Sequence, residues 1–88
     1  MDLKLPSKVA GAPAFKLMAQ KYKNMTPAQK RIAEFIVENP SLVVKKSITD
    51  LARLTQVKSE ASIVRFYRSL GYDGYKDFRI QIAQDLAG

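Results

Sequence analysis

The sequence predicts an all-α fold of about five helices in one small domain. Apolar residues recur at intervals of three and four along most of the chain, which is the period of an amphipathic helix. Polar N-cap residues and a C-terminal glycine mark several helix ends, and no stretch gives a persuasive strand. The chain has 88 residues, of which 47% are hydrophobic, so it can bury one small core.

Residues 1–13 differ from the rest because they hold Pro6, Gly11 and Pro13 and show no helical spacing. We expect a flexible leader there and a domain over 14–88. A first helix is predicted over 14–22, with apolar residues on one side and lysines on the others. Its apolar positions are Phe15, Met18, Ala19 and Tyr22.

A second helix is predicted to begin at Pro27 and to end at Asn39. Thr26 is its N-cap, and Gln29 three residues later can complete a capping box. The apolar face consists of Ile32, Ala33, Phe35, Ile36 and Val37. The link that follows, LVVKK over 42–46, could be a strand by propensity, but its context favours a helical turn.

Two short helices joined by a tight turn are predicted between residues 47 and 70. Ser47 is an N-cap with Asp50 in the first turn, and Ser59 is the N-cap of the second helix after a turn of roughly residues 55–58. The inward residues are Ile48, Leu51 and Ala52 in the first helix, with Leu54 as a further candidate, and Ile63, Phe66, Tyr67 and Leu70 in the second. This leaves Ser62, Arg65, Arg68 and Ser69 facing outward, so the polar face of the second helix is basic.

Gly71 ends that helix as a C′ glycine, and a last helix is predicted over 75–86. Its main apolar stripe is Phe78, Ile82 and Leu86, and a weaker second stripe is Ile80, Ala83 and Ala87. The second stripe would be available to a partner or to a following domain.

The charge of the chain favours nucleic acid as its partner. Fifteen Lys and Arg stand against eight Asp and Glu, which gives a net charge of +7. No apolar run approaches the roughly 20 residues of a membrane span, and the N-terminus lacks the apolar core of a signal peptide. Together with the absence of Cys, this suits a cytoplasmic protein.

The composition argues against an enzyme. The chain has no His and no Cys, so it lacks the commonest general base, the thiol nucleophile and the softest metal ligands. Glu34, Glu38, Asp50 and Asp85 occupy spacings expected of solvated helix faces or caps. No Gly-rich phosphate loop is present, and we expect no cofactor, no metal and no catalytic residue.

The chain resembles the N-terminal helix-turn-helix domain of RpiR-type bacterial transcription regulators in three segments. They are TPAQKRIAEFIVENP, SITDLARL and SEASIVRFYRSLGYDGYKDFRIQIA. The resemblance covers roughly residues 14 to 86. It implies a homeodomain-like bundle without a wing, acting as a dimer that reads a palindromic operator in the major groove. The chain departs from the family pattern at the turn, where Gln56 and Val57 lie in the region of the usual glycine and one residue is added before Ser59.

The resemblance also implies site residues. In such motifs the second helix enters the major groove, while the first helix crosses the DNA backbone. The candidates for base contact are Lys58, Ser59, Glu60, Ser62 and Arg65. The candidates for phosphate contact are Lys45, Lys46, Ser47, Thr49, Arg68, Tyr72 and Lys76. Arg65 is the foremost, because an arginine can donate two hydrogen bonds to guanine O6 and N7.

Regulators of this family also carry a C-terminal sugar isomerase domain that binds phosphosugars. The resemblance therefore implies a role in sugar or phosphosugar metabolism, with any phosphosugar effector acting through a domain that these 88 residues do not hold. We expect the chain to be an N-terminal fragment or a stand-alone variant.

Two alternatives remain open on the sequence. The last helix could bind another polypeptide through its second stripe, which would make the chain a helical protein-interaction module without specific DNA binding. Structured RNA is a third partner class, ranked below duplex DNA.

Overall fold

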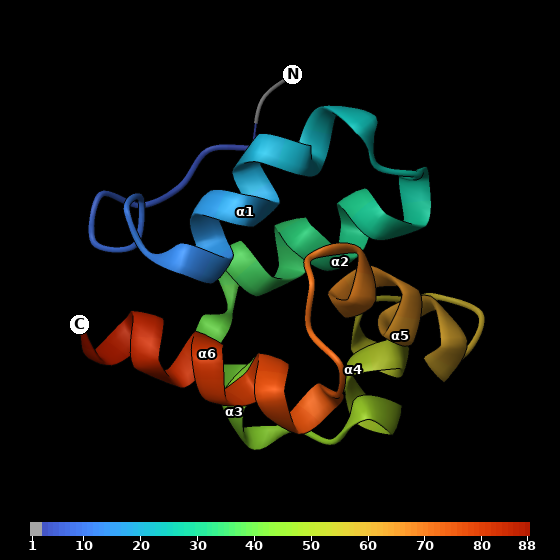
Figure 1. The fold of residues 1–88 in the computed structure, drawn as a ribbon. Helices are drawn as coiled ribbons and strands as arrows, with labels where there is room; N and C mark the ends of the chain where they lie inside the picture. Colours follow the sequence, from blue (N-terminus) through green and yellow to red (C-terminus); the bar gives the residue numbers. More distant parts are fainter. Residues whose placement is uncertain (1–2) are drawn as a thin grey trace.

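The computed structural model describes residues 3–88, and the all-α prediction is confirmed for them. Six α-helices and one short 3₁₀ turn follow one another without a strand in this part of the chain (Figure 1). Five of the helices have seven residues or more, and the sixth is the predicted helical turn at 42–46. The elements are α1 Pro13–Lys21, η1 Tyr22–Asn24, α2 Pro27–Glu38, α3 Pro40–Lys45, α4 Ile48–Leu54, α5 Glu60–Ser69 and α6 Tyr75–Ala87.

The start of α2 confirms the predicted capping box. The Thr26 hydroxyl accepts a hydrogen bond from the Gln29 backbone N–H at 3.2 Å, and the Gln29 side chain accepts one from the Thr26 N–H at 3.0 Å. Pro27 occupies the first helical position, where its missing N–H has no partner to lose. Local chemistry therefore fixes where α2 begins.

The predicted helix-turn-helix consists of α4 and α5, and only one of its two N-caps is as expected. The Ser47 hydroxyl accepts a hydrogen bond from the Asp50 N–H at 3.2 Å. Ser59 stands at the N-cap position of α5 in extended backbone, but its side chain makes no capping hydrogen bond, so this prediction is corrected. The Ser59 backbone carbonyl instead accepts from the Ser62 N–H at 3.1 Å.

Helices α4 and α5 end in the same way. A residue at positive φ follows each helix, and two backbone N–H groups at this point donate to carbonyls in the last turn of the helix. After α4 the Gln56 N–H donates to the Arg53 carbonyl and the Val57 N–H donates to the Ala52 carbonyl, at 3.1 and 3.2 Å. This is the pattern of a Schellman motif, with Gln56 at φ 60°. After α5 the same pattern has Gly71 at φ 97°, which confirms the predicted C′ glycine.

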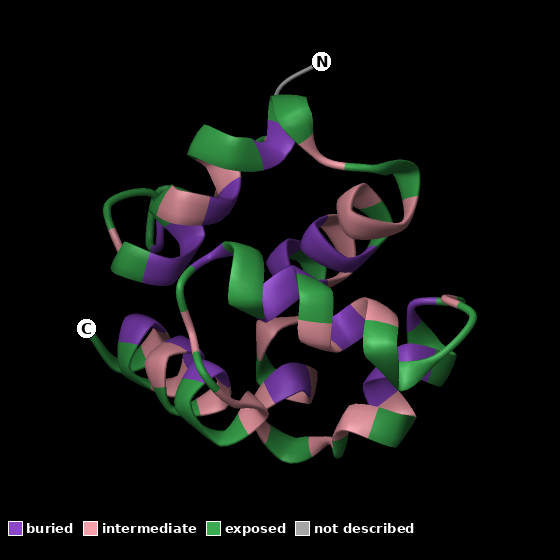
Figure 2. Cartoon of the chain, turned by 45° about the vertical axis from the view of Figure 1, so that its right-hand side comes forward, coloured by how far each residue is buried: buried purple, intermediate pink, exposed green. Residues whose placement is uncertain are grey.

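The core lies where the helices converge, with buried residues facing inward (Figure 2). Helix α5 packs against α2 and α4, while α6 packs against α1 and α3. Phe78 on α6 joins these groups, because its ring contacts Phe66 and Tyr67 on α5 and Tyr72 in the following turn. The largest side chains with essentially no exposure are Phe15, Phe66, Phe78, Met18, Ile32, Ile36, Leu51 and Ile63.

The segment before α1, expected to be a flexible leader, carries an apolar contact with the domain. Val9 is only 3% exposed and belongs to the core, while Leu3 and Leu5 pack against the core partly buried. Turns at residues 6–9 and 9–12 bring Val9 inward through backbone hydrogen bonds of 3.0 Å. The sequence carried no helical period here because the segment packs as turns.

Asp85 is buried at 4% exposure, so of the two roles expected for it, a solvated helix face or a cap, the structure shows the cap. One carboxylate oxygen accepts a hydrogen bond from the Ala14 N–H at 2.9 Å, and the other accepts one from the Gln81 amide at 2.7 Å. Ala14 lies in the first turn of α1, whose own N-cap residue Ala12 has no side-chain oxygen to offer. Asp85 on α6 therefore caps α1 from 71 residues away.

Candidate nucleic-acid interface

The outward face of α5 consists of Ala61, Arg65 and Arg68, all of which are exposed. They are four and three residues apart, which places them on one side of the helix. The opposite side carries Ile63 and Phe66 in the core, so the direction of the outward face is fixed by packing. The sequence predicted this basic face correctly, including both arginines.

Ala61 is a residue that the sequence reasoning did not select. It is exposed in the first turn of α5, on the same face as Arg65. Its spacing to Arg65 and Arg68 could have revealed it, but an alanine carries no charge or hydrogen-bonding group to draw attention. Alanine can make apolar contact with a thymine methyl group in the major groove.

A hollow separates the N-terminal turns of α4 and α5, and several predicted site residues line it. The Thr49 hydroxyl donates a hydrogen bond to the Glu60 carboxylate at 2.5 Å across this hollow. Thr49 was predicted to contact phosphate and Glu60 to contact a base, so the structure ties one candidate of each kind to the other. The lining residues are Thr49, Ala52, Arg53, Val57, Lys58, Ser59, Glu60 and Ala61.

The connection from α3 to α4 carries Lys45, Lys46 and Ser47, which the sequence predicted to lie near phosphate. Lys45 and Ser47 are exposed, and Lys46 is half-buried. The Tyr75 hydroxyl donates to the Lys46 backbone carbonyl at 2.9 Å, which fixes this connection against α6. Burial raises the pKa of the Tyr75 phenol above its ordinary value, so the donor keeps its proton well above neutral pH.

Arg65 and Ser62 border a second hollow, formed with the first turn of α2. The lining residues are Thr26, Ala28, Gln29, Ser62 and Arg65. Arg65 is exposed at its rim, whereas Ser62 is half-buried beneath it. The first turn of α2 is therefore a neighbour of the outward face of α5.

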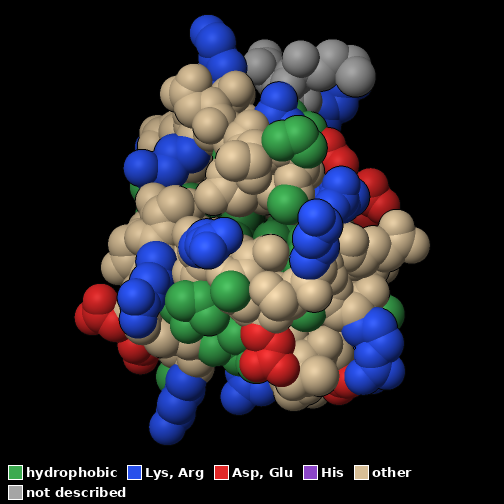
Figure 3. Space-filling model, turned by 90° about the vertical axis from the view of Figure 1, so that its right-hand side faces the viewer, with side chains coloured by type: hydrophobic (Ala, Val, Ile, Leu, Met, Phe, Trp, Pro, Cys, Tyr) green, Lys and Arg blue, Asp and Glu red, His purple; other side chains and the backbone are tan. Residues whose placement is uncertain are grey.

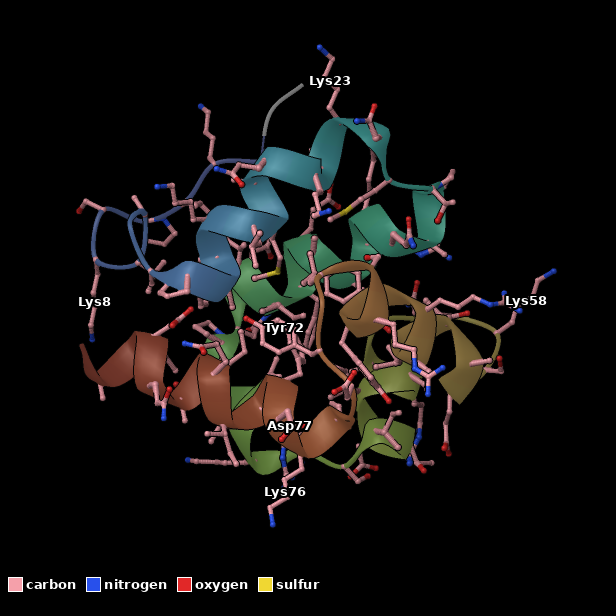
Figure 4. All side chains as sticks on the ribbon, in the orientation of Figure 1. Lys8, Lys23, Lys58, Tyr72, Lys76 and Asp77 are labelled. Atoms are coloured by element: carbon pink, nitrogen blue, oxygen red, sulfur yellow. The ribbon has the colours of Figure 1, made fainter. Side chains whose placement is uncertain are left out.

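Two further candidates for phosphate contact, Tyr72 and Lys76, follow α5 in the chain. Figure 4 shows Tyr72 in the middle of the molecule and Lys76 at its lower edge, both away from Lys58. The Tyr72 ring lies 5.5 Å from the Phe78 ring, and burial with the nearby Asp85 carboxylate raises the pKa of its phenol. Tyr72 thus has packing partners of its own, while Lys76 is exposed on α6.

Two other kinds of feature are absent from residues 3–88. Within that range no three His, Cys, Asp or Glu residues gather as metal ligands would. No helix there is long and apolar enough to cross a membrane.

The fold and the exposed basic helix define a small helical domain built around a helix-turn-helix. The family model for the rpiR-family helix-turn-helix domain matches residues 14–88. The chain belongs to the rpiR family of helix-turn-helix domains.

Several curated proteins are similar to this chain over most of its length. A protein of Thermotoga maritima, described as an uncharacterized HTH-type transcriptional regulator, is 40% identical over 68 residues, which cover 77% of this chain and 24% of that protein. The bifunctional protein glk of Burkholderia thailandensis is 34% identical over 79 residues, which cover 90% of this chain and 12% of that protein. The chain thus spans a quarter or less of the length of these relatives.

A solved structure shares the fold. It is the N-terminal domain of ybbH from Bacillus subtilis, described as a proposed transcriptional regulator, with a TM-score of 0.81 and 22% identity. The alignment covers 89% of this chain and 94% of that one.

Proposed function

We propose that this domain binds double-stranded DNA with sequence preference, through α5 placed in the major groove. The observation that carries the proposal is the outward face of α5, where Arg65 and Arg68 are exposed beside the exposed residues Lys58 and Ser59. A recognition helix contacts base edges mainly through its N-terminal residues, and Lys58, Ser59, Glu60 and Ala61 are exposed at the start of α5. Membership of the rpiR family supports the same reading.

Base contacts are proposed for the residues around the start of α5. Arg65 would read guanine through two hydrogen bonds, a pairing worth roughly 1 to 3 kcal/mol of discrimination. Ala61 is added here to the candidates from the sequence, which were Lys58, Ser59, Glu60, Ser62 and Arg65. Glu60 is the least available of them, because its carboxylate already accepts the hydrogen bond from Thr49.

Phosphate contacts are proposed for Lys45, Lys46, Ser47 and Arg68. The first three lie at the start of α4, which would cross the DNA backbone when α5 occupies the groove. Contacts of this kind position the protein and strengthen binding without selecting a sequence. Thr49, Tyr72 and Lys76, the other candidates from the sequence, stay predictions of phosphate contact.

The biological setting that we propose is transcription regulation in the bacterial cytoplasm, linked to sugar metabolism. The support for a sugar link is the similarity to proteins named glk, and a phosphosugar effector would act through a further domain. We also propose a homodimer on two half-sites about one helical turn apart, as helix-turn-helix dimers bind. A footprint at saturating protein should then protect two half-sites, and a single protected half-site would overturn the dimer.

One observation favours the alternative of a protein-interaction module. Ile80 on α6 is 45% exposed, on the second apolar stripe predicted from the sequence. Binding through such a contact should change little with salt, whereas binding through several phosphates weakens steeply as salt rises. A salt series on any partner found therefore separates the two functions.

Selection from a random duplex DNA library at about 0.1 M salt tests the main proposal. We expect an enriched sequence with two-fold symmetry. Binding without enrichment would leave a basic module that does not read sequence. No binding to any duplex would reject DNA as the partner and favour the alternative, in which the domain binds another protein through α6.

A further inference from the structure

The positive charge of the chain is concentrated at its N-terminal end rather than in the helix-turn-helix. Residues 3–31 hold seven Lys and Arg and no Asp or Glu, whereas residues 32–88 hold eight Lys and Arg and seven Asp and Glu. The basic residues of the first group are Lys4, Lys8, Lys16, Lys21, Lys23, Lys30 and Arg31. The excess that suggested nucleic acid therefore lies mostly outside the residues proposed to read it.

The end of this basic segment lies beside the recognition helix. A hollow lined by Gln20, Lys21, Asn24, Met25, Gln29 and Ser69 joins the α1–η1 corner to the C-terminal turn of α5. Gln29 also lines the hollow that contains Arg65 and Ser62. The two hollows therefore lie on either side of Gln29, in the first turn of α2, with Arg65 in one lining and Lys21 in the other.

Figure 3 looks onto this side of the molecule, and Lys and Arg side chains are spread from its top to its bottom. Figure 4 places Lys23 at the top, on the α1–η1 corner, and Lys58 beside the start of α5. Within residues 3–88 the only ion pair joins Arg53 to Asp50. Lys21 and Lys23 are exposed and carry charge that no carboxylate in the described chain neutralises.

The backbone that carries these lysines is held in place. The Tyr22 hydroxyl donates to the Glu34 carboxylate on α2, and the Lys30 ammonium lies 5.2 Å from the centre of the Tyr22 ring. The hydrogen bond to Glu34, with burial, raises the pKa of the Tyr22 phenol. Tyr22 lies between Lys21 and Lys23, so its contacts fix the corner from which both lysines project.

The size of the domain brings this corner over the DNA backbone. The domain measures 31 × 28 × 21 Å, and the major groove of B-DNA is about 12 Å wide. With α5 in the groove, the elements beside α5 must overlie the phosphates that border it. The elements on the side away from α4 are the first turn of α2 and the α1–η1 corner.

We propose that Lys21 and Lys23 form a second phosphate-binding surface. This surface binds the DNA backbone on the side of α5 opposite to Lys45 and Lys46. This inference rests on the proposed placement of α5 in the groove. It assigns to the α1–η1 corner a share of the affinity and none of the sequence preference.

The test compares Lys21→Gln/Lys23→Gln with the unchanged chain on the enriched site, across a salt series. Each lost phosphate contact lowers the slope of log affinity against log salt by about 0.9, so the double variant should lose about 1.8. The preference for the enriched site over a scrambled duplex should stay the same. Thermal unfolding should also be unchanged, because exposed substitutions of this kind rarely alter stability.

Lys8→Gln is the matched control. It also removes an exposed lysine of the basic segment, but Lys8 lies with Gln84 and Gly88 at the far end of α6, away from α5 (Figure 4). We expect the slope of log affinity against log salt for Lys8→Gln to equal that of the unchanged chain. Lys21→Gln alone should lower this slope by about 0.9.

The outcomes separate this inference from the proposed function. An unchanged slope in the double variant, with binding to the enriched site intact, would overturn the second surface and leave the role of α5 standing. Equal losses in Lys8→Gln and Lys21→Gln would also overturn it, since only net charge would then matter. Failure of the unchanged chain to bind any duplex would overturn both.

Discussion

The N-terminal third and the helix-turn-helix differ in how their charged side chains are used. Residues 3–31 carry seven cations and no acidic residue, and five of their lysines are exposed. In the helix-turn-helix some polar groups pair with each other, as in Thr49 with Glu60 and Asp50 with Arg53, while Arg65 stays exposed on the outward face of α5. Contacts of cations with phosphates carry no sequence preference, whereas an arginine on α5 that reaches base edges can distinguish bases. Affinity and specificity should therefore be separable by mutation.

The largest expected effect concerns Asp85, which ties the N-terminal third to α6. Asp85→Ala removes the acceptor of the Ala14 N–H and of the Gln81 amide in a buried position. A hydrogen bond to a charged group contributes roughly 1.5 to 3 kcal/mol, and we expect the free energy of unfolding to fall by about this amount. Urea unfolding measures it.

Asp85→Asn is the control for that change, because it keeps one acceptor oxygen while removing the charge. Asp85→Asn should lower the free energy of unfolding clearly less than Asp85→Ala does. If Asp85→Ala left the midpoint and slope of the urea transition unchanged, the cap from α6 to α1 would contribute nothing to stability.

The next effect concerns specificity. Arg65→Ala should lose roughly 1 to 3 kcal/mol of discrimination at one base pair of each half-site and leave the others unchanged. The measurement is the affinity for every single-base variant of the enriched site. Arg31→Ala, which removes an exposed arginine from α2, is the matched control and should preserve all preferences. An unaltered profile in the Arg65 variant would move base recognition to other residues of α5.

A smaller effect is expected from a phosphate contact beside α4. Lys46→Ala should weaken binding to all duplexes by a similar factor and lower the salt slope by about one. The Lys46 backbone carbonyl that accepts from Tyr75 is retained in this variant, so the fold should be unaffected. A loss confined to the enriched site would show that Lys46 reads bases instead.

The smallest effect concerns the turn between α4 and α5. Gln56 adopts φ 60°, a conformation that costs a residue with a side chain about 1 to 2 kcal/mol. Glycine avoids this cost, but it loses more backbone entropy on folding, which offsets part of the gain in stability. We expect Gln56→Gly to raise the free energy of unfolding by up to about 1 kcal/mol.

The equivalent position after α5 provides the reciprocal test. An added Cβ at Gly71 would meet nothing within 4 Å, so Gly71→Ala should be destabilising through its φ of 97° alone. A stabilising effect of Gly71→Ala would show that φ does not govern these two turns.

The sequence predicted the features that depend on neighbouring residues. The capping box of Thr26, the Ser47 cap and the Gly71 helix end all follow from side chains within a few positions of each other. The inward and outward faces of α5 follow from the helical period in the same way. These local signals are enough for the fold class and for the position of the candidate interface.

Features that depend on distant contacts could not be predicted from local patterns. Asp85 looked like a solvated carboxylate because its partner Ala14 lies 71 residues earlier in the chain. Val9 showed no helical period, since turns rather than a helix bring it to the core. The hollow that joins Lys21 to α5 depends likewise on how α1 and α2 pack. The net charge was visible at once, but only its location in the fold suggests a second surface.

The most direct test measures affinity for the enriched site and for a scrambled duplex across the same salt series. Phosphate contacts from both regions predict two steep lines of log affinity against log salt. Base contacts from α5 predict that the enriched site binds more tightly at every salt concentration, by at least about fivefold for one good arginine contact. Two coincident lines would contradict the account, because they would show a basic domain that binds DNA without reading it.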